Sequence, residues 1–154
     1  MNIESILTRE RTHANIQAAS KKRAIEKAAI FIAETDDSLD TQDVYNHLIA
    51  REKLGTTALG FGIAIPHCRL PACQKITGGL FTLEEPVDFD AFDDQLVSTL
   101  FVILVPEDEV EEHLKVLGAL AGRFEDENFR KRLTRARTND DLYNVMVEAF
   151  KPDA

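Results

Sequence analysis

The sequence predicts an α/β or α+β fold in which helices at both ends of the chain surround a mixed parallel and antiparallel β-sheet. Two segments before residue 55 and further segments after residue 107 show the apolar spacing of amphipathic helices. The residues between them are glycine-punctuated and β-prone. Strands are expected over 78–83 and 97–105, and the connection between them is too short for a helical crossover. We therefore expect this pair to be antiparallel.

Two helices are expected in the N-terminal third. Ser20 is a suitable N-cap for a helix over 20–35. One face of that helix is apolar and consists of Ala24, Ile25, Ala28, Ala29 and Ile32. A second helix is expected over 41–54, because its apolar residues recur at helical spacing and Gly55 is a natural stop.

The middle of the chain predicts the strands. Residues 56–65, "TTALGFGIAI", and 78–83, "GGLFTL", are β-prone. Residues 97–105, "VSTLFVILV", are almost continuously apolar, as expected of a central strand that is covered on both faces. Pro106 ends that strand, and the acidic connection over 84–95 is rich in turn residues.

Helical spacing returns at residue 108. The helix expected over 108–124 has an apolar stripe of Leu114, Leu117, Leu120, Ala121 and Phe124. A short basic helix is expected over 128–137. Thr138 and Asp141 resemble a capping box at the start of a last helix over 139–150.

Length and charge limit the possible functions. A chain of 154 residues suggests one domain, 1–154. The net charge of −9 argues against nucleic-acid binding and against an anionic membrane surface, but it permits a basic protein partner. No apolar run is long enough to cross a bilayer and no signal peptide is visible, so we expect no membrane insertion and a cytoplasmic location. Two cysteines do not make a disulfide framework.

The stretch "GFGIAIPHCRL", residues 60–70, presents a histidine in an unusual setting. Pro66 lacks a backbone donor and is expected to end the preceding strand, so that His67 stands at a strand terminus. Gly60 and Gly62 permit positive φ angles, and such loops can direct N–H groups at an anion. The plainer interpretation is a glycine-rich hairpin followed by a surface histidine.

Arg51 and His113 lie on inward-facing helical stripes. Arg51 continues the line of Val44 and Leu48, near the end of its helix. It either complements the helix dipole with its head in water or reaches the loop that carries His67. His113 precedes Leu117, Leu120 and Phe124 on one stripe, which makes it either a core-edge histidine bonded to backbone or a neutral donor in a site.

These three residues together suggest phosphoryl chemistry. Imidazole is a competent nucleophile, and phosphoryl transfer depends mainly on positioning and on electrostatic stabilisation. A metal site of His67, Cys68, Cys73 and His113 is a weaker alternative, because adjacent His and Cys residues of an extended strand point in different directions. A binding module without phosphorylation is a further alternative.

Residues 51–67, "REKLGTTALGFGIAIPH", resemble the signature of the IIA proteins of the bacterial phosphoenolpyruvate phosphotransferase system, in the fructose/mannitol superfamily. The downstream stretch over 89–124 is similar to the nitrogen-regulatory branch in its "FDAFDD" turn, its "LVP" strand end and its "HL" helix start. The resemblance extends over about residues 1–150. It implies one type 2 IIA domain with a mixed sheet and helices on both faces.

The resemblance implies a role for each matching residue. His67 is the residue that accepts a phosphoryl group from a histidine phosphocarrier protein, with Nε2 (tele) as the suspected nitrogen, although the sequence itself leaves the nitrogen open. Arg51 and His113 match the residues near the phosphate. In the signature, Thr56 replaces a usual serine and Ala58 a usual glycine.

The implied activity is a phosphotransfer component with a phosphohistidine intermediate rather than a turnover enzyme. No cofactor and no metal are implied. The phosphorylation state is expected to regulate partner proteins such as kinases or potassium transport components. The alternative is a sugar-specific IIA protein that passes phosphate to a IIB domain. Cys68 and Arg69 stand where a Gly-Lys pair is common after the histidine, so the detail of this loop is expected to differ.

Overall fold

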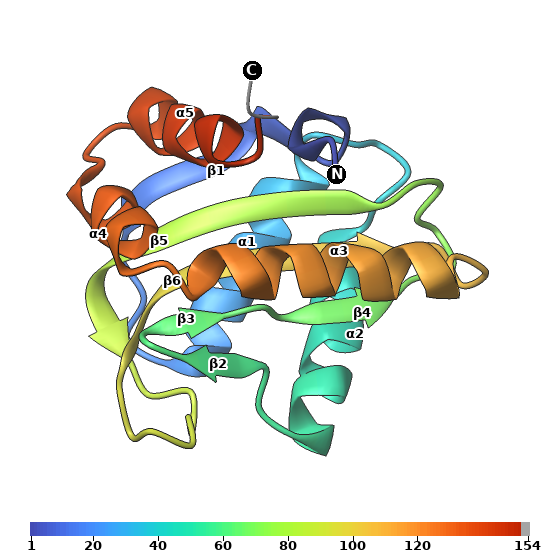
Figure 1. The fold of residues 1–154 in the computed structure, drawn as a ribbon. Coiled ribbons are helices and arrows are strands. Elements are labelled where there is room, and N and C mark those ends of the chain that lie inside the picture. The colour runs from blue at the N-terminus through green and yellow to red at the C-terminus, as the bar shows by residue number, and fades with distance from the viewer. Residues whose placement is uncertain (152–154) are drawn as a thin grey trace.

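The computed structural model describes residues 1–151, which form a six-stranded sheet with helices on both faces (Figure 1). The last three residues of the predicted domain, 1–154, lie outside the described residues. The strand order is β1-β5-β6-β3-β2, and β4 also pairs with β6. The strands are β1 (Leu7–Ile16), β2 (Ala58–Gly60), β3 (Ile63–Ala64), β4 (His67–Arg69), β5 (Thr77–Val87) and β6 (Val97–Val105).

The sheet is mixed, as predicted. Strands β5 and β6 pair antiparallel, whereas β1 is parallel to β5, and β3 and β4 are parallel to β6. Strand β6 has the predicted bounds and lies at the centre, with every residue except Ser98 buried. Strand β5 continues to Val87, four residues beyond the predicted end.

Helices cover both faces and enclose two apolar cores. α1 (Lys21–Ala33) and α2 (Thr41–Leu54) pack on one face; α3 (Val110–Phe124), α4 (Glu127–Arg135) and α5 (Asn139–Ala149) pack on the other (Figure 1). Side chains predicted as caps perform that role, because Ser20 accepts the backbone N–H of Arg23 and Thr138 that of Asp141. No helix within residues 1–151 is long and apolar enough to cross a membrane.

Strand β1 was not predicted, because its sequence lacks the apolar alternation of a half-buried strand. It is preceded by a short 3-10 helix, η1 (Ile3–Ser5). The strand buries Arg11, whose guanidinium donates to the carbonyls of Gly78 and Ile6 at 2.8 and 3.0 Å. Burial lowers the pKa of Arg11, and these bonds satisfy two of its donors. A charged residue therefore occupies a buried position of β1 at which the usual alternation of a strand has an apolar residue.

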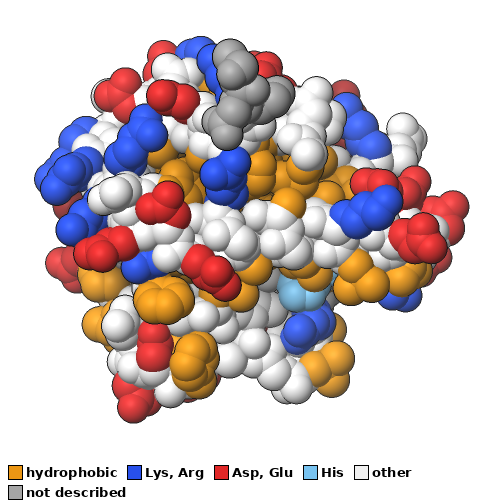
Figure 2. Space-filling view, in the orientation of Figure 1, with side chains coloured by type: hydrophobic (Ala, Val, Ile, Leu, Met, Phe, Trp, Pro, Cys, Tyr) orange, Lys and Arg blue, Asp and Glu red, His pale blue; other side chains and the backbone are white. Residues whose placement is uncertain are grey.

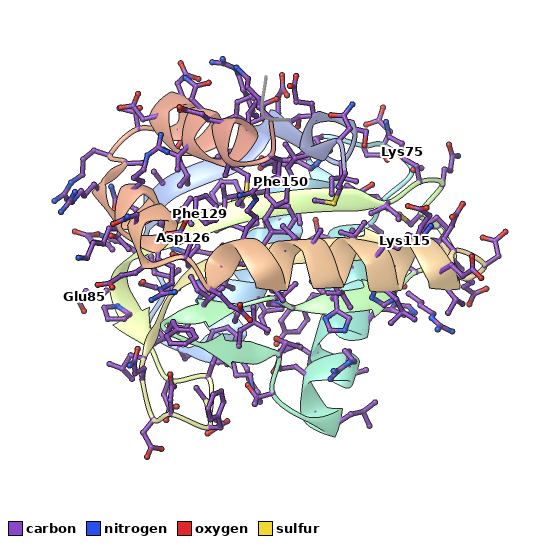
Figure 3. All side chains as sticks on the ribbon, viewed as in Figure 1. Lys75, Glu85, Lys115, Asp126, Phe129 and Phe150 are labelled. Carbon is purple, nitrogen blue, oxygen red and sulfur yellow. The ribbon has the colours of Figure 1, made fainter. Side chains whose placement is uncertain are left out.

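The predicted stripe of α3 was partly wrong. Leu114 is 65% exposed, and the buried positions are His113, Val116, Leu120 and Phe124. Phe129 of α4, labelled in Figure 3, packs on Phe124 with ring centroids 5.6 Å apart. The inward face of α3 therefore includes His113 and excludes Leu114, so that His113 faces the sheet.

Strand β3 ends at Ala64, just before Pro66, as predicted, and a second strand, β4, begins directly after Pro66 at His67. Ile63 pairs with Thr99 and His67 with Ile103, so β3 and β4 keep one register along β6. Proline removes a donor but retains its carbonyl, which accepts the N–H of Ile103 at 2.9 Å. His67 is therefore the first residue of β4 and is held by strand pairing on its C-terminal side.

Candidate functional site

The structure brings His67 and His113 together. His67 begins β4 and lies on the side of the sheet that α3 covers, while His113 comes from the first turns of α3. Their ring centroids are 5.2 Å apart, and the rings meet edge to face at 66°. Spacing along the chain alone could not establish that these two histidines meet. On the surface, Figure 2 shows a histidine beside a basic side chain just below α3.

The ring of His67 is oriented by a backbone carbonyl. Its Nδ1 lies 2.7 Å from the carbonyl oxygen of Ile65. Because a carbonyl can only accept, Nδ1 carries the proton in this contact, and Nε2 of the neutral ring keeps a free lone pair. The backbone therefore determines that Nε2 is the ring nitrogen with the free lone pair.

His113 has a buried nitrogen without a partner. The residue is 9% exposed, and its Nε2 makes no hydrogen bond to any described residue. Buried polar atoms are nearly always paired, so an orphaned ring nitrogen beside a second histidine indicates a place for a further hydrogen-bonding group. The backbone-bonded alternative from the sequence does not account for this atom.

Both histidines are held neutral. The pKa of His67 is lowered mainly by burial and further by Arg51, while its bond to Ile65 and the Glu52 carboxylate act in the opposite direction. The pKa of His113 is also lowered mainly by burial, with His67, Arg69 and Arg51 adding to the effect. At pH 7 both rings are therefore neutral, and a lone pair is available.

Arg51 lies in the last turn of α2, and its positive charge lowers the pKa of both His67 and His113. It is half-buried and donates to the carbonyl of Gly55 at 2.9 Å, which stabilises the C-terminus of the helix. Its charge also acts on both rings. The interpretation of Arg51 as a residue at the helix end is therefore confirmed by its bond to Gly55, while its approach to the loop of His67 stays a prediction.

Two residues near the site were missed in the sequence. Arg69, noted only as a departure, follows His67 by two residues on β4, so strand alternation directs it to the same side, and its charge lowers the pKa of His113. Glu52 is buried and accepts the N–H and hydroxyl of Thr57. The alternation was visible in the sequence; the burial of Glu52 was not.

Gly60 and Gly62 adopt the predicted positive φ angles, 94° and 80°, but they do not join this cluster. Gly62 lies five residues before His67, which is about 16 Å along an extended chain at the usual rise. The N–H of Phe61 is taken by the Asp93 carboxylate at 2.9 Å. The prediction that this loop aims its donors at the same site is therefore not supported by the geometry.

Cys68 lies on the opposite face of the sheet from His67. It belongs to the core under α1 and α2, and burial raises the pKa of its thiol to about 12. Alternation along β4 thus separates the two side chains, as argued against a metal site. Within residues 1–151, no three His, Cys, Asp or Glu side chains are grouped as metal ligands.

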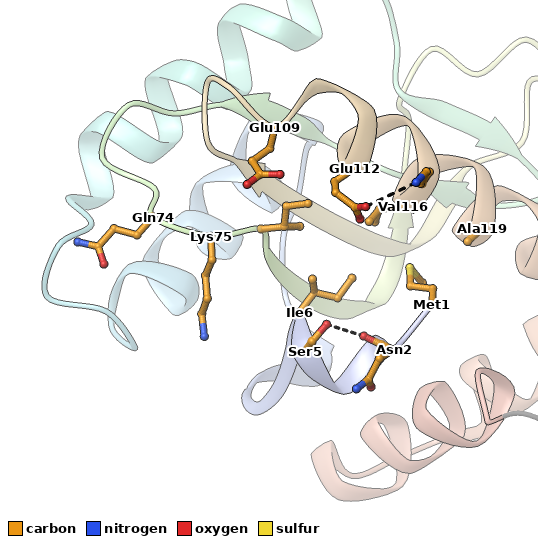
Figure 4. Close-up of a pocket in the computed structure, with 12 residues that line it drawn as sticks. Met1, Asn2, Ser5, Ile6, Gln74, Lys75, Glu109, Glu112, Val116 and Ala119 are labelled. Carbon is orange, nitrogen blue, oxygen red and sulfur yellow. Dashed lines mark hydrogen bonds and ion pairs between the residues drawn. The ribbon is translucent and has the colours of Figure 1, made fainter.

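A cavity of about 700 Å³ lies on the other flank of α3 (Figure 4). Its walls include Ile6 near the N-terminus, Lys75 before β5, and Glu112 and Val116 of α3. None of the residues around His67 lines it. The histidine pair is therefore not part of this cavity.

Comparisons with known proteins agree with this architecture. A nitrogen regulatory protein of Pseudomonas aeruginosa is 44% identical over 148 residues, which cover 96% of this chain and 96% of that protein. The crystal structure of the nitrogen regulatory protein IIA-Ntr from Neisseria meningitidis is 39% identical, with a TM-score of 0.87 over 94% of this chain and 98% of that one. The mannitol IIA protein of Escherichia coli is 25% identical, with a TM-score of 0.76 over 91% and 98%.

The resemblance noted in the sequence is confirmed by these relatives, as is the predicted fold with helices on both faces of a mixed sheet. A family model described as "Phosphoenolpyruvate-dependent sugar phosphotransferase system, EIIA 2" matches residues 5–149, nearly the whole chain. The chain therefore belongs to the EIIA 2 family of the phosphoenolpyruvate-dependent sugar phosphotransferase system.

Proposed function

We propose that this chain is a cytoplasmic nitrogen-regulatory phosphotransferase protein that takes up a phosphoryl group on Nε2 of His67 and controls partner proteins through its phosphorylation state. The observation that carries the proposal is the histidine pair. His67 has a free Nε2 lone pair. The ring of His113 lies 5.2 Å from the ring of His67 between centroids, and its buried Nε2 has no partner among the described residues. Membership of the EIIA 2 family supports the reaction class.

The proposed donor is a phosphorylated histidine phosphocarrier protein. The Nε2 lone pair of His67 attacks phosphorus and forms a P–N bond, while the P–N bond of the donor breaks and its electron pair returns to the donor imidazole. Nδ1 of His67 keeps its proton and its bond to Ile65. The step balances without a separate proton when the other nitrogen of the donor ring is protonated: the donor then leaves as neutral imidazole, and the His67 ring, neutral before the attack, takes over the positive charge.

The surrounding side chains have distinct roles in this proposal. Arg51 and Arg69 supply positive charge for the roughly two negative charges of the phosphoryl group. His113 donates from its otherwise unpaired Nε2 to a phosphoryl oxygen. Its own neutrality is maintained by burial before phosphate arrives, and the new anion then raises its pKa.

Labelling tests the assignment. The chain is incubated with the donor cascade and assayed for acid-labile phosphate, followed by mass mapping of the modified residue. His67→Ala is expected to abolish the label, whereas His47→Ala, a half-exposed histidine on α2, retains it. If His67→Ala is labelled as well as the unmodified chain, the site is elsewhere. A phosphate mapped to Nδ1 would contradict the choice of Nε2.

The second candidate is a sugar-specific IIA protein, because a mannitol IIA protein has the same fold at 25% identity. Transfer of the phosphate onward to a sugar-transport IIB domain would favour it. The regulatory proposal instead expects partners, such as kinases or potassium transport components, that bind the phosphorylated and free forms differently. Capture experiments with both forms of the chain, compared with transfer to a IIB domain, separate the two.

A further inference from the structure

We infer that Glu52 is a positioning residue for His67: together with Lys21 it anchors Thr57, whose carbonyl accepts the N–H of Ile65, and the carbonyl of Ile65 in turn selects the reactive ring nitrogen. The inference rests on the proposed function, because it explains how His67 presents Nε2. It concerns a carboxylate that touches neither the phosphoryl group nor the reacting ring. Its role is exerted through the intervening backbone.

The carboxylate of Glu52 is buried and fully engaged. Its side chain is 3% exposed at the end of α2. One oxygen accepts the backbone N–H of Thr57 at 2.8 Å, and the other accepts the Thr57 hydroxyl at 2.5 Å. Lys21, the first residue of α1, approaches the first oxygen at 3.0 Å. A buried charge is retained only with such partners, so the segment at Thr57 is held firmly against α1 and α2.

The anchored segment is connected to His67 by two backbone contacts. The carbonyl of Thr57 accepts the N–H of Ile65 at 3.0 Å. The carbonyl of Ile65 then accepts Nδ1–H of His67 at 2.7 Å. Pro66 restricts Ile65 to an extended conformation, which limits how far this carbonyl can turn. The position of the Nδ1 acceptor is therefore set by the segment that Glu52 holds.

Glu52 also influences the ring electrostatically. Burial and Arg51 lower the pKa of His67, and the Glu52 carboxylate acts against them. A free nitrogen that is less basic is a weaker nucleophile. The carboxylate thus supports the reaction in two ways, by holding the acceptor in place and by offsetting part of the loss of basicity.

The test uses Glu52→Gln, which keeps the shape of the side chain but removes its charge and one acceptor oxygen. The probe is phosphoramidate, a small P–N donor that releases ammonia when the imidazole nitrogen attacks its phosphorus. We expect phosphorylation of His67 to slow about tenfold, since small misplacements of reacting groups have effects of this size or larger. We also expect ¹⁵N spectra to show a smaller share of the Nδ1–H tautomer and a lower titration midpoint for His67.

Glu26→Gln, at a surface ion pair with Arg23 on α1, is the matched control and is expected to leave all three readouts unchanged. If Glu52→Gln fails to fold, Thr57→Val and Thr57→Ser replace it: Val removes the hydroxyl donor and slows labelling, and Ser restores it. Unchanged tautomer and rate in a folded Glu52→Gln or Thr57→Val overturn the inference. Failure of the unmodified chain to label at His67 overturns the proposed function instead, while the tautomer measurement still decides the role of Glu52.

Discussion

Replacing His113 by leucine tests whether the histidine pair is built for a ligand at the expense of stability. In the free protein, the buried Nε2 of His113 makes no hydrogen bond to a described residue, and the residue is only 9% exposed. Leucine has a similar volume, suits a helix and has no polar atom to desolvate. We therefore expect His113→Leu to stabilise the unphosphorylated fold.

The structure sets the size of both effects. An unpaired buried polar group costs about 1–3 kcal/mol, and at the lower end a gain of about 1 kcal/mol raises the Tm of a chain of this size by about 2–4 °C. In the phosphorylated protein the same substitution is expected to be unfavourable, because it removes a hydrogen-bond donor to the phosphoryl group. A hydrogen bond to a charged group contributes about 1.5–3 kcal/mol, so its loss weakens retention of the phosphoryl group about ten- to hundredfold.

Thermal unfolding of the free protein and the equilibrium of phosphoryl exchange with the donor measure the two effects separately. His47→Leu, on the exposed side of α2, serves as the control and is expected to change neither. A His113→Leu protein that is less stable than the unmodified chain, or that keeps the phosphoryl group equally well, would refute the reasoning. The first result would mean that the ring is a well-paired core residue, and the second that it has no part in the site.

Three further results are expected. Burial lowers the pKa of His67 in the folded protein below its usual 6.5, so between pH 6.5 and the folded pKa the unfolded chain binds more protons than the folded protein. The free energy of unfolding should therefore decrease as the pH falls through this range. His67→Gln should make this decrease smaller in a series of urea denaturations at different pH values. Gly79→Ala should destabilise the fold by about 1–3 kcal/mol in urea unfolding, because an added Cβ would lie 2.8 Å from the ring of Phe81 and 2.9 Å from Ile32; unchanged stability would show that this contact relaxes. Cys68, whose thiol pKa is raised to about 12 by burial, should resist alkylation at pH 8 until the protein unfolds, and rapid labelling of the native protein would contradict its placement.

Much of the fold was predictable because its signals are local. The caps Ser20 and Thr138, the stop at Gly55 and the continuous apolar run of β6 each depend on a few neighbouring residues. Strand β1 escaped prediction because its stability comes from pairing with β5, a partner about 70 residues away along the chain. Its polar residues are tolerated there because the sheet supplies acceptors for them, as it does for Arg11.

The sequence by itself determined which residues were candidates for the site. Proline before His67, the inward stripes that carry Arg51 and His113, and the motif around them are all readable along the chain. Only the tertiary structure decided which of them meet. It brings His67 to His113, separates the Gly60–Gly62 turn from them, and adds Arg69 and Glu52. The physical reason is that strand register and helix packing set distances between residues far apart in the chain, while the choice of the free His67 nitrogen depends on one backbone carbonyl whose position the whole network holds.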